Sequence, residues 1–130
     1  MAFAVRAVLD TSVVIATDVG PLEGELAISA TTLAELHFGV LVASDEAARA
    51  ERLRRLSVLQ RQFDALPVDE AVAASYGRLA SAVVAAGRKP RARTMDLLIA
   101  ATAHAHAARL YTRNARDFVG VEDLVQVVSV

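Results

Sequence analysis

Short apolar runs alternate with longer helix-forming segments along the whole chain, and this alternation constrains the fold more than any other feature. The first run covers residues 5–9 and ends at Asp10. Further short runs lie at residues 26–29, 66–68, 110–112 and 125–128, and each reads as a buried strand. Strands that alternate with helices at such spacings predict an α/β fold with a mostly parallel central sheet flanked by helices. We expect one domain over residues 1–130.

The expected helices fill the intervals between these runs. They cover residues 12–18, about 32–42, a segment that Asp45 opens, 69–87 and about 95–108. Asp69 and Thr94 are predicted to cap the last two helices, and Gly87 is predicted to end the first of these. The helix over 95–108 is apolar almost all round, so we expect it to be central and buried.

Bulk composition excludes several classes of protein. The chain has 130 residues and no cysteine, which rules out a disulfide framework and a thiolate zinc site. Mean hydropathy is positive, but the longest stretch without a charged residue is 97–108, shorter than the roughly 20 residues that span a membrane. Asp10 leaves no room for the apolar core of a signal peptide. We therefore expect a soluble, cytoplasmic protein that does not enter a membrane.

Charge is distributed unevenly along the chain. The net charge of −1 gives no reason to expect nucleic-acid binding. Between residues 71 and 116, however, eight basic residues surround a single acid, Asp96. Such a stretch suits a metal site that attracts phosphates, and it is equally compatible with a solvated arginine-rich surface loop.

Acidic residues follow two of the predicted strands. Asp10 ends the first, and residues 114–117 follow the strand that ends at Thr112. Because ligands of open α/β sheets bind beyond the carboxyl ends of the strands, both segments point to one edge of the sheet. This shared edge is the predicted site.

Each acid also has a structural explanation. Asp10 is a possible helix cap, Glu35 completes a possible capping box with Thr32, Asp96 suits the positive end of a helix dipole, and Asp117 is a possible turn residue. If several of these carboxylates lie close together, their mutual repulsion either raises their pKa values or is relieved by a bound cation. Oxygen ligands favour a hard ion, Mg²⁺ or Mn²⁺. The histidines at 37, 104 and 106 are interpreted as surface or packing residues.

Four short motifs, in order, resemble those of the PIN-domain family, and more narrowly of the VapC-type toxins of bacterial toxin–antitoxin pairs. They are LDTS at 9–12, TLAEL at 32–36, MDLLIAA at 95–101 and TRNARDF at 112–118, so the resemblance spans nearly the whole chain. It implies a PIN-like fold and a catalytic, metal-binding site made of Asp10, Glu35, Asp96 and Asp117. Asn114 stands where many relatives carry another acid, which leaves open whether Asn114 or Asp117 lies nearer the metal.

The resemblance further implies an endoribonuclease that forms a homodimer and is inhibited by a cognate antitoxin. The expected reaction is Mg²⁺-dependent hydrolysis of RNA phosphodiester bonds, with Mn²⁺ able to substitute. We expect Asp10 and Asp96 to be direct ligands, with Glu35 and Asp117 completing the shell or orienting water. The residues expected to support these ligands are Ser12, Thr112 and Asn114, and those expected to contact RNA phosphates are Arg93, Arg113 and Arg116.

Two other functions are alternatives to this one. A phospho-acceptor receiver domain would need paired acids after the first strand and a lysine near the end, whereas Asp10 stands alone and the only lysine is Lys89. A catalytically silent PIN module that binds RNA or a protein partner stays open. Metal-dependent RNA cleavage would separate these alternatives. The loop over residues 88–93 is unusually basic for such a chain.

Overall fold

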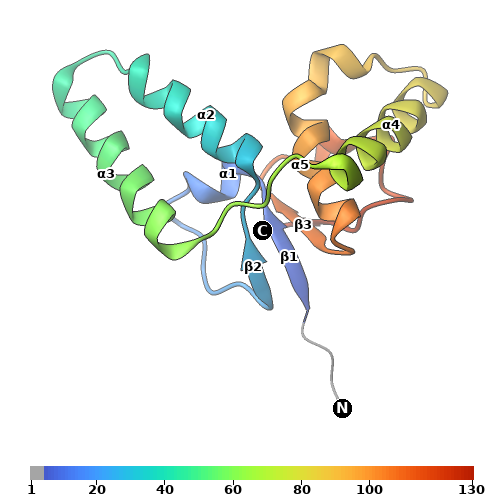
Figure 1. The fold of residues 1–130 in the computed structure, drawn as a ribbon, viewed down its shortest axis with the longest axis horizontal. Coiled ribbons are helices and arrows are strands. Elements are labelled where there is room, and N and C mark those ends of the chain that lie inside the picture. The colour runs from blue at the N-terminus through green and yellow to red at the C-terminus, as the bar shows by residue number, and fades with distance from the viewer. Residues whose placement is uncertain (1–4) are drawn as a thin grey trace.

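The computed structural model describes residues 5–130 (Figure 1). Its sheet has four parallel strands in the order β2-β1-β3-β4. The strands are β1 (Arg6–Leu9), β2 (Glu25–Ala27), β3 (Arg109–Thr112) and β4 (Val127–Ser129). The first strand therefore lies in the middle of the sheet, beside a strand that follows it by about a hundred residues. The predicted α/β fold with a parallel sheet is confirmed.

The helices form two groups on opposite sides of this sheet. They are α1 (Thr11–Val14), α2 (Ala30–Leu41), α3 (Glu46–Gln62), α4 (Glu70–Ala85) and α5 (Thr94–Ala105), with short 3-10 turns η1 (Pro90–Arg93) and η2 (Ala115–Phe118). Figure 1 shows α2 and α3 as a pair on one side, and α4 with α5 on the other. Among the described residues, no helix is long and apolar enough to cross a membrane.

Alternation along the strands divides the apolar core between the two faces of the sheet. Val8 and Leu110 belong to the larger cluster, which packs against α4 and α5. Ala7, Leu9 and Tyr111 belong to the smaller cluster on the opposite face. Successive strand side chains point to opposite faces, so one short strand contributes to both clusters. The buried apolar face of α5 confirms that this helix is central.

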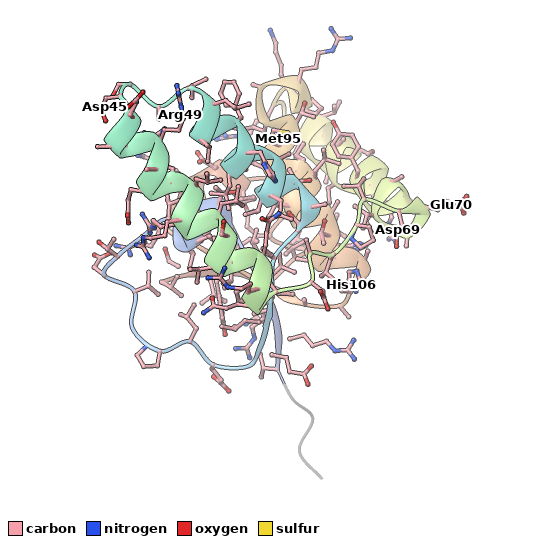
Figure 2. The ribbon with its side chains drawn as sticks, turned by 60° about the vertical axis from the view of Figure 1, so that its left-hand side comes forward. Asp45, Arg49, Asp69, Glu70, Met95 and His106 are labelled. Atoms are coloured by element: carbon pink, nitrogen blue, oxygen red, sulfur yellow. The ribbon has the colours of Figure 1, made fainter. Side chains whose placement is uncertain are left out.

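Asp45 and Asp69 each cap a helix with a side chain that accepts a backbone hydrogen bond. Asp45 accepts from the Ala48 N–H at 2.7 Å, and Asp69 accepts from the Val72 N–H at 3.0 Å. Both predicted helix starts are confirmed, and Figure 2 shows these two aspartates far apart. The predicted cap at Thr94 is wrong. Thr94 is already helical, and its hydroxyl donates to the Arg91 carbonyl oxygen.

Gly87 ends the α4 segment, as predicted. Its φ of +77° lies in the left-handed region, where glycine has no steric penalty. The Gly87 N–H donates to the Val84 carbonyl oxygen at 2.9 Å, and the Arg88 N–H donates to that of Val83 at 3.0 Å. This pair of bonds is the Schellman arrangement, which fixes the direction in which residues 88–93 leave the helix.

Some predicted element bounds were wrong. Residues 66–68 form only an isolated bridge between Leu66 and Ser29, because Pro67 has no N–H with which to extend a strand. The helix expected over 12–18 ends at Val14. The last strand starts two residues later than expected, since the Val125 N–H is bonded to the Val121 carbonyl oxygen in the preceding turn. None of these differences moves the acids from the carboxyl edge of the sheet.

Candidate active site

Asp10 lies directly after β1 and is almost completely buried, with 5% of its surface exposed. It precedes α1, but its side chain caps no N–H of that helix. Instead its Oδ2 accepts two hydroxyl hydrogen bonds, from Ser12 Oγ at 2.7 Å and from Thr112 Oγ1 at 2.8 Å. Thr112 ends the neighbouring strand β3, so the parallel pairing of β1 with β3 brings these groups together. Capping therefore does not explain this buried carboxylate.

Glu35 lies in the second turn of α2. The predicted capping box with Thr32 is not formed, because the helix is capped by Ser29, whose Oγ accepts from the Thr32 N–H at 3.1 Å. Glu35 Oε1 instead accepts from Thr11 Oγ1 at 2.6 Å, and Thr11 Oγ1 lies 3.0 Å from Thr32 Oγ1. These hydroxyls turn the glutamate toward the residues that follow β1.

Asp96 and Asp117 share one cation, Arg93. Its Nη1 lies 2.9 Å from Asp117 Oδ1 and 3.7 Å from Asp96 Oδ2. Asp96 stands in the first turn of α5, and Asp117 stands in η2, after β3. The two carboxylates, with 27% and 25% of their side chains exposed, are more accessible than Asp10. One arginine is thus shared by two acids that come from different elements and offsets part of their charge.

The acids influence one another electrostatically. The pKa of Asp96 is raised from 3.8 to about 6, first because burial disfavours its charged form, and then because Asp10 and Asp117 are negative. Arg93 opposes this shift, and Glu35 adds to it. The charges of all three other acids therefore raise the pKa of Asp96. We call Asp10, Glu35, Asp96 and Asp117 the acidic cluster.

The chemistry of the acidic cluster suits a hard divalent cation, because every candidate ligand is a carboxylate oxygen. As the side chains stand, no three acidic or histidine groups within residues 5–130 are close enough together to hold a metal. Hydroxyls engage Asp10 and Glu35, while Arg93 engages Asp96 and Asp117. The donor set therefore fits the ion, and holding it would require Arg93 to leave the two aspartates.

The other predicted supporting residue, Asn114, is exposed on the turn after β3. Its backbone N–H donates to Thr112 Oγ1 at 2.9 Å, the same oxygen that donates to Asp10. Asp117 contributes to the raised pKa of Asp96 through its negative charge. Ser12 Oγ also accepts a hydrogen bond from the Arg113 N–H at 3.0 Å. Hydroxyl groups thus tie the turn after β3 to the carboxylate after β1.

The predicted phosphate-contacting arginines are placed differently. Arg93 lies against the acidic cluster itself. Arg113 is paired with exposed Asp18 through two bonds of 2.8 and 3.1 Å, and this cation lowers the pKa of Asp18. Arg116 is exposed in η2. The histidines lie outside the acidic cluster, and His104 Nδ1 packs 2.7 Å from Ser75 Oγ between α5 and α4.

Sequence reasoning missed two hydroxyls beside Glu35, those of Thr11 and Thr32. Both residues lie at or near helix starts, where threonine is ordinary. No local pattern distinguishes a capping hydroxyl from one that reaches a glutamate on another element. The only available signal was their position within the LDTS and TLAEL motifs.

Comparison with known proteins gives a consistent result. The PIN domain family model matches residues 7–124. Ribonuclease VapC4 of Mycobacterium tuberculosis (strain ATCC 25618 / H37Rv) is 37% identical over 131 residues, which cover 96% of this chain and 97% of that protein. Ribonuclease VapC8 of the same organism is 43% identical over 99 residues, which cover 73% of this chain and 88% of that protein.

The fold comparison agrees. The crystal structure of VapBC-5 from Mycobacterium tuberculosis, a member of the VapBC family of toxin–antitoxin systems, matches with a TM-score of 0.82 and 36% identity, covering 96% of this chain and 97% of that one. FitAcB from Neisseria gonorrhoeae matches with a TM-score of 0.74 and 29% identity, covering 93% and 95%. The chain belongs to the PIN-domain family, and within it to the VapC ribonucleases.

Proposed function

We propose that this chain is a Mg²⁺-dependent endoribonuclease, the toxin of a VapBC-type toxin–antitoxin pair, which hydrolyses RNA phosphodiester bonds at the acidic cluster. The observation that carries the proposal is the electrostatic coupling of Asp96 to Asp10, Asp117 and Glu35. A purely structural set of acids would have no reason to converge on one partly buried carboxylate, since like charges that lie close together destabilise the fold.

In this proposal, Asp10 and Asp96 would hold the metal directly, while Glu35 and Asp117 would complete its surroundings or orient the attacking water. A bound Mg²⁺ would lower the pKa of water and stabilise charge on the phosphate. Ser12 and Thr112 hold Asp10 in one orientation through their bonds to Oδ2. Mn²⁺ is expected to substitute, because it favours the same oxygen ligands.

Arginines supply the opposite charge. Once Arg93 is released from Asp96 and Asp117, its guanidinium is positioned to meet a backbone phosphate. Arg113 and Arg116 lie on the turn after β3 and are proposed to contact phosphates further along the RNA strand. Such contacts position the RNA without selecting its sequence.

The proposed protein partner is a cognate antitoxin. A groove of about 520 Å³ runs between α1, α2 and α3, and Glu35 lies in its wall together with apolar side chains that include Ile15, Leu36 and Leu59. An amphipathic helix of the antitoxin would cover these side chains and block the acidic cluster from one side. We also propose a homodimer and, because cellular RNA is the substrate, a cytoplasmic location.

The test is RNA cleavage by the purified protein with Mg²⁺, with Mn²⁺ and with excess EDTA. We expect cleavage with either ion and none with EDTA. Asp10→Asn should abolish it, whereas Asp123→Asn, which removes the same charge from an exposed turn, should not. Cleavage that persists in excess EDTA would overturn the metal mechanism.

One observation favours a second candidate, a catalytically silent module that binds RNA or a partner. Arg93 occupies the two aspartates, and no metal-holding trio is arranged among the described residues. This candidate predicts RNA or antitoxin binding without cleavage under any metal condition.

A further inference from the structure

A cavity of about 250 Å³ lies beside the acidic cluster, between α4, η1 and η2. Three cations line it, Arg88, Lys89 and Arg93, together with one acid, Asp117. Its wall is apolar and includes Val119, whose surface is 40% exposed. We call residues 88–93 the basic loop. The cavity therefore combines a cationic rim with an apolar wall.

The backbone of the basic loop is held at both ends. At its start, the Arg88 N–H is bonded to the Val83 carbonyl oxygen as α4 ends. At its end, η1 runs into α5, and the Thr94 hydroxyl donates to the Arg91 carbonyl oxygen at 3.2 Å. The positions from which the Arg88 and Lys89 side chains extend are thus set by the fold, which reduces the entropy lost when they engage a ligand.

Cavity and acidic cluster share a border. Arg93 and Asp117 line the cavity, and they are joined to each other by the 2.9 Å ion pair. Asp96 lies on the other side of the same arginine. A ligand in the cavity is therefore next to the carboxylates at which the proposed cleavage takes place.

The lining specifies the chemistry of the ligand. Arg93 is already paired with Asp117, so Arg88 and Lys89 supply the charge that selects an anionic group, and the apolar wall selects something less polar attached to it. The volume is below the roughly 300–1,000 Å³ of pockets that enclose drug-sized molecules, so it admits one small unit and not a base-paired helix. One nucleotide of a single strand meets all three requirements.

We propose that this cavity is a subsite for one unpaired nucleotide of the RNA strand, adjacent to the phosphate that is cut. Arg88 and Lys89 hold the phosphate of that nucleotide, and its sugar and base lie against the apolar wall. The inference rests on the proposed function, because it takes RNA as the substrate. It implies that the enzyme needs a locally unpaired strand beside the cut, since a paired base cannot enter.

The first test measures binding of a fluorescently labelled single-stranded RNA by anisotropy, in EDTA, so that the proposed cleavage does not interfere. Arg88→Ala with Lys89→Ala should weaken binding roughly tenfold, as expected when charge-assisted contacts are lost. The slope of log affinity against log salt should flatten by about 0.7 for each phosphate contact removed. Arg78→Ala with Arg91→Ala removes the same charge from exposed positions that do not line the cavity, and should leave the slope nearly unchanged.

The second test fills the cavity without altering charge. Ala92 is exposed and lines the cavity, so Ala92→Phe should fold normally and weaken RNA binding with an unchanged salt slope. Ala74→Phe, at an exposed position of α4 outside the cavity, is the control. Thermal melts check that all variants are folded. RNA with one abasic position at the subsite should bind the parent and Ala92→Phe equally.

Equal losses in both double variants, or undiminished binding by Ala92→Phe, would overturn the subsite. The cleavage assay separates this outcome from failure of the proposed function. If the parent cuts RNA but the cavity variants bind like the parent, the subsite is wrong and the function stands. If the parent never cuts RNA but the cavity variants lose binding selectively, the subsite stands and the chemistry is wrong.

Discussion

The two halves of the acidic cluster are held by different kinds of partner. Asp10 and Glu35 accept hydrogen bonds from neutral hydroxyls on neighbouring elements. Asp96 and Asp117 share the guanidinium of Arg93, which comes from the basic loop. A hydroxyl leaves the carboxylate charge in place and fixes its direction, whereas an arginine offsets negative charge. A single guanidinium offsets only part of the charge of the two aspartates. The first half is therefore oriented by hydrogen bonds, and the second is held by a cation that a metal ion would have to displace.

The largest expected effect comes from Asp96→Asn in the arginine-held half. Cleavage should fall to less than roughly a hundredth of the parent rate, because changes behind a metal ligand already cost 10–100-fold. The metal-free protein should be as stable as the parent or more so, since a carboxylate with a raised pKa is removed. Retained cleavage with a lowered melting temperature would exclude Asp96 from the site.

The pH dependence sharpens the same test. The folded pKa of Asp96, about 6, lies above its ordinary value of 3.8, so the fold favours the protonated form. Below about pH 3 the group is mostly protonated in both folded and unfolded chains, and Asn and Asp should be nearly equivalent. Between about pH 4 and pH 6 the unfolded chain loses the proton that the folded chain retains, so the parent becomes less stable relative to the Asn variant. Urea melts in EDTA at pH 3 and pH 7 should show the stabilising effect of Asn only at pH 7.

A smaller effect is expected from Thr112→Val in the hydroxyl-held half. The change removes one donor from Asp10 and leaves the Asn114 N–H without its acceptor. Stability should fall by about 1–3 kcal/mol, and activity by roughly 10–100-fold as Asp10 loses its fixed orientation. Thr102→Val removes a buried hydroxyl that donates to the Leu98 carbonyl oxygen, away from the acids, and should leave activity intact. Equal activity losses in the two variants would contradict this role for Thr112.

The smallest effect is expected from Arg93→Ala. Its ion pairs are partly exposed, so the metal-free protein should lose about 1 kcal/mol or less. Calorimetry without RNA should show tighter Mg²⁺ or Mn²⁺ binding, because the competing cation is gone. Arg91→Ala, on the same basic loop, should change neither quantity. Weaker metal binding in Arg93→Ala would mean that this arginine supports the metal site and does not compete with it.

Sequence reasoning predicted the features that depend on local pattern. The strand before Asp10, the burial of the helix that carries Asp96 and the shared edge of the sheet all follow from hydrophobic periodicity and from the position of acids after strands. Asp45 and Asp69 were predicted to open helices because capping is decided within four residues of sequence.

The partners of the acids were not predictable in the same way. Thr11 reaches Glu35 across 24 residues of sequence, and Thr112 reaches Asp10 across 102. Such contacts depend on which strands pair, and no local pattern records them. Arg93 was expected to contact phosphate, but its nearest partners in the fold are carboxylates. The composition of the basic loop indicated a positive surface, but it did not show that Arg93 pairs with carboxylates of the acidic cluster.

The strand order β2-β1-β3-β4 also has a consequence for synthesis of the chain. The first carboxylate follows β1, but its hydroxyl donor Thr112 and the fourth acid, Asp117, are translated about a hundred residues later. Domains fold as units while the ribosome adds about 5–20 residues per second, so the N-terminal half waits for its central neighbour β3. A nascent chain shorter than this lacks two of the groups that the proposed nuclease needs. The ribosome making such a toxin would therefore not be exposed to it until residues 112–117 have been translated and have left the ribosome.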